Sequence, residues 1–286
     1  MKKNLLRIIN LLGAALPKSV QRFIVDFPGV LGILQRLGHD VADQVITPEG
    51  FRLSINPLLH SNLDRQGGLA DYEPEMRSAI SMLTRPGWCA YDVGANVGVF
   101  SFLFASLVGE SGRVYAFEPE PNNYKCLKLS VSQNNVSNII TDNRALGATS
   151  QKELFDRRGG AFSGRLVGTE GTHTPTGNVI QVEATSIDAL IENESYRVPD
   201  ILKIDVEGNE GLVLMGMQKT LAAHSPAIIC ELHSHLGDSI EDVHRLFRDN
   251  NYTAYSISDY LLRERKAKAL DSLMGIRHIV ALRSEA

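Results

Sequence analysis

Acidic residues stand at the ends of apolar segments in this 286-residue chain. Asp92 stands at the end of the segment that leads to Gly94, and Glu118 ends the next segment, twenty residues past Gly98. A carboxylate in that place can accept hydrogen bonds from both ribose hydroxyls, while glycines let a ligand approach the backbone closely. The N–H groups that begin the following helix attract electron-rich ligands. These residues predict a nucleoside-binding site.

The glycine motif distinguishes two nucleoside cofactors. A dinucleotide fingerprint requires glycine where this chain has Asn96 and Val99. An acid such as Asp92, two residues before the first glycine, repels a pyrophosphate but attracts the ammonium group of an amino acid. S-adenosylmethionine has that ammonium group and a ribose, but no phosphate. The motif therefore favours S-adenosylmethionine, and an NAD-dependent oxidoreductase is the weaker alternative.

A second group of ionisable residues follows two later apolar segments. Lys203, Asp205 and Glu207 alternate, so their side chains start from one face of a strand, and Glu231 and His233 alternate likewise. Ligands of open α/β sheets bind at the carboxyl ends of the strands, where these groups would meet. Charges gathered there are costly unless they pair or serve a function. An ion pair between Lys203 and an acid is the structural alternative.

The residues described so far resemble motifs of S-adenosylmethionine-dependent methyltransferases, and this resemblance implies methyl transfer to a hydroxyl. The transfer is an in-line displacement, so the protein must align the acceptor oxygen with the methyl carbon and the sulfur. A general base with a pKa near neutrality assists it by removing the hydroxyl proton, and we expect His233 to be that base. Asp205 and Glu207 would orient His233 or hold the acceptor. We expect no metal ion, although a metal bridged by these acids is a minor alternative.

The pattern of elements indicates an α/β protein. Apolar strands and helices alternate from residue 88 onward, which predicts a parallel sheet with right-handed crossovers. Residues 1–65 are expected to form an N-terminal cap and residues 66–286 the catalytic domain. Loop-forming residues at 157–178 suggest either an active-site lid or a disordered insertion. Expected strands lie at 45–46, 51–53, 88–93, 113–117, 138–141, 179–184, 200–207, 227–232, 252–257 and 278–282, and expected helices at 76–83, 121–133, 187–191 and 211–221.

Composition limits the possible partners and compartments. The net charge of −4 opposes an extended phosphate-binding surface, so we expect no nucleic-acid partner. The three cysteines form no Cys-x-x-Cys pair, which indicates reduced residues of a cytoplasmic protein. Residues 1–16 have the apolar spacing of an amphipathic helix with basic residues between. That helix either packs on the protein or makes a peripheral contact with the inner face of the membrane.

The motifs resemble those of the FkbM-type methyltransferases, a family of class I S-adenosylmethionine-dependent enzymes. The resemblance covers residues 72–233, and Asn209 departs from it because a small residue is expected there. It implies a Rossmann-like fold with a seven-stranded, mostly parallel sheet of order 3-2-1-4-5-7-6 and helices on both faces. The motifs are Tyr72-Glu73, the segment 92–98, Glu118-Pro119, Ala145-Leu146-Gly147, the segment 203–210 and Glu231-Leu232-His233.

The resemblance also implies O-methylation of a sugar, a glycan or a hydroxylated small molecule. Natural products, lipids and proteins are alternative acceptors. Asp142 and Asn143 follow the third strand, where a side chain can hydrogen-bond adenine, although a plain turn would explain them as well. The expected cofactor-binding residues are Tyr72, Glu73, Asp92, Gly94, Asn96, Gly98, Glu118, Pro119, Asp142, Asn143, Ala145 and Asp205.

Overall fold

The computed structural model describes residues 43–56, 60, 63, 68–157, 164–167, 179–233, 240–263 and 266–284. The expected amphipathic helix at 1–16 lies outside these residues, as does most of the segment 158–178. Within the described part of the chain, no helix is both long enough and apolar enough to cross a membrane.

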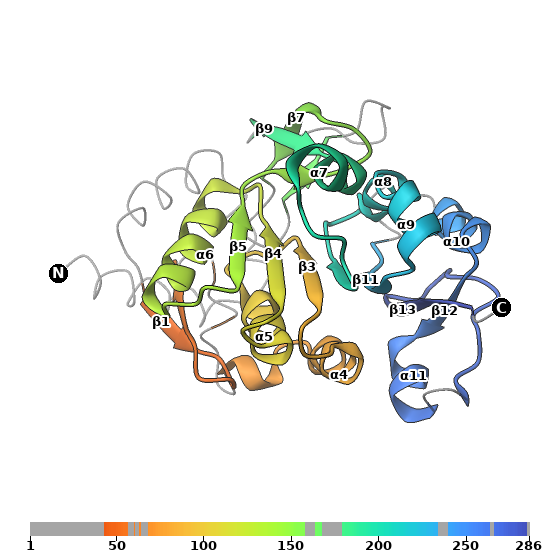
Figure 1. The fold of residues 1–286 in the computed structure, drawn as a ribbon, viewed down its shortest axis with the longest axis horizontal. Helices are drawn as coiled ribbons and strands as arrows, with labels where there is room; N and C mark the ends of the chain where they lie inside the picture. The colour runs from red at the N-terminus through yellow and green to blue at the C-terminus, as the bar shows by residue number, and fades with distance from the viewer. Residues whose placement is uncertain are drawn as a thin grey trace, which may run out of the picture.

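Seven strands form the large sheet, which runs through the middle of Figure 1. Numbered along the chain within this sheet, they lie in the order 3-2-1-4-5-7-6, the order expected above. The seventh is antiparallel to both of its neighbours, and the remaining neighbours pair in parallel. The strands are β3 (Cys89–Val93), β4 (Arg113–Phe117), β5 (Ile139–Asp142), β10 (Ile201–Ile204), β11 (Ala227–Glu231), β12 (Tyr252–Ser256) and β13 (His278–Arg283).

Both faces of this sheet are buried under helices, because its strands are apolar on both sides. In β3, Ala90 packs into one hydrophobic cluster while its neighbour Tyr91 packs into the other, as the alternation of a strand requires. The first cluster includes residues of α4 (Pro74–Leu83), α5 (Val99–Val108), α6 (Pro121–Gln133) and α11 (Ile257–Arg263). The second includes residues of α7 (Ile187–Glu194), α8 (Glu210–Met215), α9 (Gln218–His224) and α10 (Ile240–Asp249).

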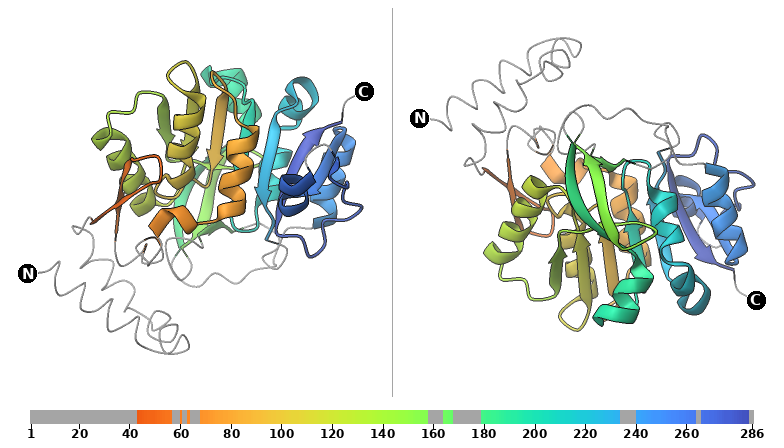
Figure 2. Two further views of the ribbon diagram at one scale, coloured as in Figure 1. Left: turned by 90° about the horizontal axis from the view of Figure 1, so that it is seen from below. Right: turned by 90° about the horizontal axis from the view of Figure 1, so that it is seen from above.

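A four-stranded sheet lies apart from the large one, as Figures 1 and 2 show. It consists of β6 (Ala145–Leu146), β9 (Val179–Thr185), β7 (Gln151–Asp156) and β8 (Arg165–Leu166), in that order. The sequence predicted β9, treated the segment 157–178 that contains β8 as loop-forming, and predicted no strand at β7. The first four residues of β7 are exposed or half-buried, so no apolar alternation marks them.

Of two further predictions, a strand pair is confirmed and a single helix is wrong. The strand pair near the N-terminus is confirmed as β1 (Asp43–Ile46) and β2 (Arg52–Ile55), which lie beside a short 3-10 helix, η1 (Gly68–Asp71). The single helix predicted at 211–221 is wrong, because Gly216 separates α8 from α9. The turn there packs closely, and a Cβ on Gly216 would lie 2.0 Å from the carbonyl oxygen of Gly147.

Candidate active site

A cavity of about 280 Å³ lies where β3, β4 and β10 of the large sheet end. Residues of β7 and β8 line it as well, so the small sheet forms one of its walls. Most of the predicted site residues line this cavity together: Tyr72, Glu73, Gly94, Asn96, Glu118, Pro119, Ala145, Asp205 and Glu207.

The glycines of the motif are required by the protein's own packing. Gly94 has φ 77°, and a Cβ there would lie 1.9 Å from the carbonyl oxygen of Asp205. Gly98 has φ 100°, caps α5, and a Cβ there would lie 2.8 Å from Leu127. Gly98 does not line the cavity, so it acts on the turn instead of contacting a ligand. The turn presents Asn96 and its neighbours to the cavity.

Glu118 is a buried carboxylate with room for a ligand's hydroxyl groups. Its Oε2 accepts from the backbone N–H of Asn96 at 2.8 Å, and its Oε1 accepts from that of Glu120 at 2.8 Å. The remaining donor, Asn123 Nδ2, is 3.5 Å away, so acceptor capacity is left for hydroxyls. Burial raises the pKa of Glu118 to about 8, although these N–H donors oppose the shift. The surroundings match the ribose-binding role predicted for this residue.

Glu73 supplies a second, unsatisfied acceptor to the cavity. Its Oε2 is buried and has no hydrogen-bond partner. Burial, reinforced by the charge of Asp205, raises the pKa of Glu73. A buried carboxylate oxygen without a donor is costly unless a ligand supplies one. An ammonium group is such a donor, so the residues present fit the amino-acid part of S-adenosylmethionine.

Three of the seven described non-glycine residues with positive φ line the same cavity. Glu73, Asn96 and Glu207 have φ values of 44°, 52° and 56°, and all three line it. Non-glycine residues adopt such angles at a cost of about 1–3 kcal/mol, and they persist where the surrounding structure holds them in place. Strain of this kind is typical of binding and catalytic sites.

Two predicted acids lie elsewhere. Asp92 is fully buried beneath the cavity, where its Oδ2 accepts from Ser101 Oγ at 2.6 Å and its Oδ1 lies 3.5 Å from Lys203 Nζ. It therefore does not meet the ammonium group predicted for it. Asp142 is occupied by Arg144, whose Nε and NH2 donate to it at distances of 2.6–3.1 Å. Arg144 lines the cavity in its place, and Asn143 is exposed outside it.

Lys203 forms the ion pairs considered as a structural alternative. Its side chain is 2% exposed, and its Nζ lies 3.3 Å from Asp205 Oδ2 and 2.9 Å from the carbonyl oxygen of Gly94. Burial by itself would lower the pKa of Lys203, but Asp205 and Asp92 raise it above its ordinary value. Lys203 thus stays charged and ties β10 to the turn after β3.

His233 is enclosed by carboxylates. Its Nδ1 lies 2.9 Å from Glu210 Oε1, and its Nε2 lies 3.4 Å from both Glu207 Oε2 and Glu231 Oε1. Burial would lower the pKa of His233, but the bonds to Glu210 and Glu231 raise it to about 11. An imidazolium has no lone pair with which to accept a proton. The geometry therefore opposes the predicted role of His233 as general base.

Glu207 faces the cavity more openly. Its side chain is 25% exposed, whereas the His233 side chain is 8% exposed and does not line the cavity. Burial raises the pKa of Glu207 to about 7. A carboxylate with this accessibility can contact an acceptor directly.

Several lining residues were not predicted as site residues. Phe155, Arg165 and Leu166 belong to the small sheet, and Arg277 directly precedes β13. Arg277 Nε donates to Glu231 Oε1 at 2.6 Å. Asn209, the departure from the family motif, donates from Nδ2 to the carbonyl oxygen of Leu166 at 3.4 Å. The sequence marked Asn209 as a departure from the motif but gave no signal for this contact.

Comparison with known proteins identifies the family. The model of the methyltransferase FkbM domain matches residues 92–254, more than half of the chain. The chain belongs to the FkbM methyltransferase family. The family named from the motifs is thus confirmed, and the chain is an S-adenosylmethionine-dependent methyltransferase.

Individual FkbM relatives are distant. The 31-O-demethyl-FK506 methyltransferase FkbM of Streptomyces tacrolimicus is 27% identical over 202 residues, which cover 62% of this chain and 77% of that protein. The hexuronic acid methyltransferase AglP of Haloferax volcanii is 30% identical over 160 residues, or 56% of this chain and 61% of AglP. The crystal structure of an FkbM methyltransferase from Methylobacillus flagellatus aligns with 96% of this chain and 57% of its own, at 14% identity and a TM-score of 0.48.

Proposed function

We propose that this protein transfers the methyl group of S-adenosylmethionine to a hydroxyl oxygen of a sugar-type acceptor. The observation that carries the proposal is the layout of one cavity. Glu118, suited to a ribose, and the acids Asp205, Glu207 and Glu231, suited to a polyhydroxylated acceptor, all line it. Residues 66–286 would form the methyltransferase domain and residues 1–65 an accessory segment.

The charge of the cavity supports this cofactor. Six carboxyl groups but four basic side chains line it, so its walls carry an excess of negative charge when the acids are ionised. S-adenosylmethionine carries a sulfonium, an ammonium and a carboxylate, and is therefore a net cation. In the proposed pose its ribose hydroxyls donate to Glu118 and its ammonium group donates to Glu73. When bound there it supplies the methyl group.

The residues of the chain orient the acceptor and take up its proton. The bond between the methyl carbon and sulfur breaks, sulfur keeps the electron pair, and a bond to the acceptor oxygen forms. The hydroxyl proton passes to a cavity carboxylate, and Glu207 is the best placed of them because its side chain is partly exposed to the cavity. Asp205 and Glu231 would hold neighbouring hydroxyls by hydrogen bonds.

The relatives and the polar walls both support the proposed acceptor class. AglP is named for a hexuronic acid, and the Streptomyces enzyme for a substrate methylated on oxygen. Carboxylates at the acceptor side of the cavity suit a molecule with several hydroxyl donors. Hydroxylated natural products are the alternative acceptors.

Methyl transfer from isotopically labelled S-adenosylmethionine tests the proposal. A panel of sugar acids, neutral sugars and hydroxylated macrolides would serve as acceptors. We expect label on oxygen and a drop of about 10²-fold or more in turnover for Glu207→Gln, with S-adenosylhomocysteine affinity unchanged. Glu183→Gln, an exposed residue paired with Lys152, is the matched control. Label recovered on nitrogen or carbon would contradict the proposal.

A further inference from the structure

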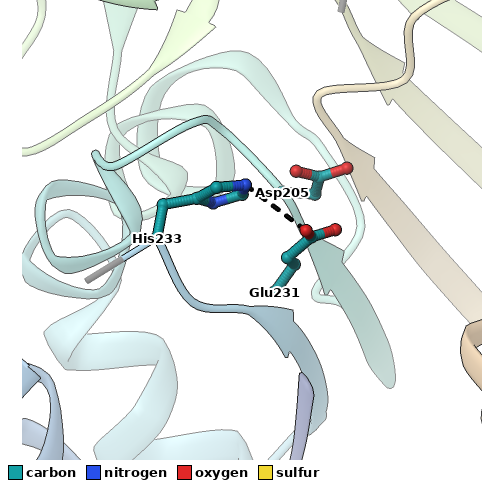
Figure 3. Close-up of side chains that lie close together, drawn as sticks. All are labelled: Asp205, Glu231 and His233. Carbon is teal, nitrogen blue, oxygen red and sulfur yellow. Dashed lines mark ion pairs between the residues drawn. The ribbon is translucent and has the colours of Figure 1, made fainter. Parts of the chain in front are cut away.

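Three potential metal ligands converge beside the cavity. Asp205 follows β10, Glu231 ends β11, and His233 lies two residues further on. One ligand atom from each lies within 4.8 Å of the other two, and Figure 3 shows the side chains gathered around a common point. His233 Nε2 and Glu231 Oε1 are 3.4 Å apart. Ligands at right angles around an ion with bonds of about 2.0–2.2 Å lie about 3 Å apart, so the side chains would have to draw closer, by up to about 2 Å, to complete the site.

A carboxylate holds the ring of His233 in the way that is usual for metal-binding histidines. Its Nδ1 lies 2.9 Å from Oε1 of Glu210, a residue that is 1% exposed. Because an ionised carboxylate only accepts hydrogen bonds, Nδ1 must carry the proton, and Nε2 is the atom turned toward Glu231. A carboxylate behind the ring in this way fixes the tautomer and ring orientation of a ligating histidine.

Carboxyl groups outnumber the basic side chains around the three ligands. Glu73, Glu207 and Glu210 add to Asp205 and Glu231 in this region, and the buried Glu210 Oε2 has no hydrogen-bond partner. Besides His233, the basic groups that face the acids are Lys203 at 3.3 Å from Asp205, Arg277 at 2.6 Å from Glu231, and His278 Nε2 at 3.5 Å from Glu231. Arg277 is the exposed member of this set, at 70%.

We propose that Asp205, Glu231 and His233 bind a divalent metal ion at the acceptor side of the cavity. Two carboxylate oxygens and one imidazole nitrogen suit Mn²⁺ or a similar first-row ion better than Ca²⁺, which prefers oxygen ligands alone. The proposal favours the minor alternative, a metal bridged by these acids, over the expectation of a site without metal. The ion leaves coordination positions for oxygens of the acceptor, because Asp205 and Glu231 both line the cavity.

The ion would give His233 a role that it cannot have as an imidazolium, which has no lone pair to offer. His233 would act as a ligand through Nε2, and Glu207 would remain available for the acceptor. A bound ion would also allow an acidic acceptor to enter between the carboxylates. The proposal deepens the proposed function, but metal binding can be measured without turnover.

Electron paramagnetic resonance with Mn²⁺ on the full chain, after treatment with a chelator, tests the site. We expect one Mn²⁺ per chain and a nitrogen coupling from the imidazole that disappears in His233→Gln. Asp205→Asn and Glu231→Gln should each weaken binding at least tenfold, while Glu183→Gln leaves it unchanged. Arg277→Met should bind Mn²⁺ more tightly, because the guanidinium that competes for Glu231 is gone. Ca²⁺ should displace Mn²⁺ poorly.

Three results would overturn the site. They are no saturable Mn²⁺ binding below millimolar concentration in both the wild type and Arg277→Met, binding without a nitrogen coupling, and equal affinity in Glu231→Gln. Circular dichroism checks that each variant is folded, and Glu231→Gln serves where Asp205→Asn, which also removes a Lys203 partner, fails to fold. Mn²⁺ binding without any methyl transfer would retain the metal site and refute the proposed function.

Discussion

At the scale of single residues, the ionisation of Glu118 makes cofactor affinity depend on pH. Its pKa is about 8 in the free protein, raised by burial, so the carboxyl is largely protonated at neutral pH. Ribose hydroxyls donate to the ionised form and stabilise it, so cofactor binding releases a proton. Affinity should therefore rise between pH 6 and pH 8 and level off above that.

Calorimetry with S-adenosylhomocysteine at pH values from 6 to 9 measures this slope. Glu118→Gln should bind at least tenfold more weakly at pH 8 and show no comparable rise. Glu183→Gln, far from any predicted contact, should retain the slope of the wild type. A wild-type affinity that does not change with pH would show that another group binds the ribose.

The sequence predicted the positions of site residues better than their partners. Glu118 and Asp205 were placed correctly at the cavity because strand ends and glycine turns are local signals. The environment of Asp92 was not predictable from its neighbours, because Ser101 and Lys203 reach it from α5 and β10. His233 likewise depends on Glu210, on a separate helix. Contacts between distant segments decide what such groups do.

At the scale of elements, the turn after β3 depends on a glycine. In Gly94→Ala the new Cβ would lie 1.9 Å from the carbonyl oxygen of Asp205, so β3 and β10 would have to separate. We expect a loss of more than about 4 kcal/mol in unfolding free energy, or failure to fold. Urea unfolding measures it.

Gly109 provides the matched control for that experiment. It has φ 67°, but a Cβ there meets nothing within 4 Å, so Gly109→Ala should cost only about 1–3 kcal/mol from backbone strain. Equal losses in the two variants would show that the positive φ, and not the close approach of Asp205, makes Gly94 necessary.

Asn209 connects the start of α8 to β8 of the small sheet. Asn209→Ala removes its bond to Leu166 and should speed amide hydrogen exchange across residues 164–167. The unfolding free energy should fall by no more than about 1.5 kcal/mol, since one neutral hydrogen bond is lost. Asn250→Ala, which removes a bond to the carbonyl oxygen of Leu246, should leave that exchange unchanged. Unaltered exchange in Asn209→Ala would show that the strand is held by other contacts.

Among the elements, those of the large sheet were predictable because each strand is a short apolar run bounded by turn residues. The small sheet was not, since β7 is mostly exposed and polar and β8 has two residues. These strands form because β7 pairs with β9, and not because of a local sequence pattern. Prediction failed where long-range pairing replaces a local signal.

At the scale of the whole molecule, the cavity joins parts that are distant in sequence. Its walls come from the large sheet, the small sheet and Tyr72-Glu73 before α4. S-adenosylhomocysteine at about 100 times its dissociation constant should therefore stabilise the protein by about 2.7 kcal/mol. The midpoint of thermal unfolding should rise by roughly 5–10 °C in one cooperative step. Scanning calorimetry measures this, and a separate transition unaffected by ligand would show that the parts unfold independently.

The reversed direction of β13 has a further consequence. β13 runs antiparallel to β11, so His278 at the beginning of β13 pairs with Glu231 at the end of β11. β13 therefore begins at the edge of the sheet where the parallel strands end. Arg277, the last residue before β13, lines the cavity beside Glu231. The connection 266–277 therefore brings to the site a side chain that the large sheet itself does not supply. Exchanging this connection between FkbM enzymes should then alter acceptor choice.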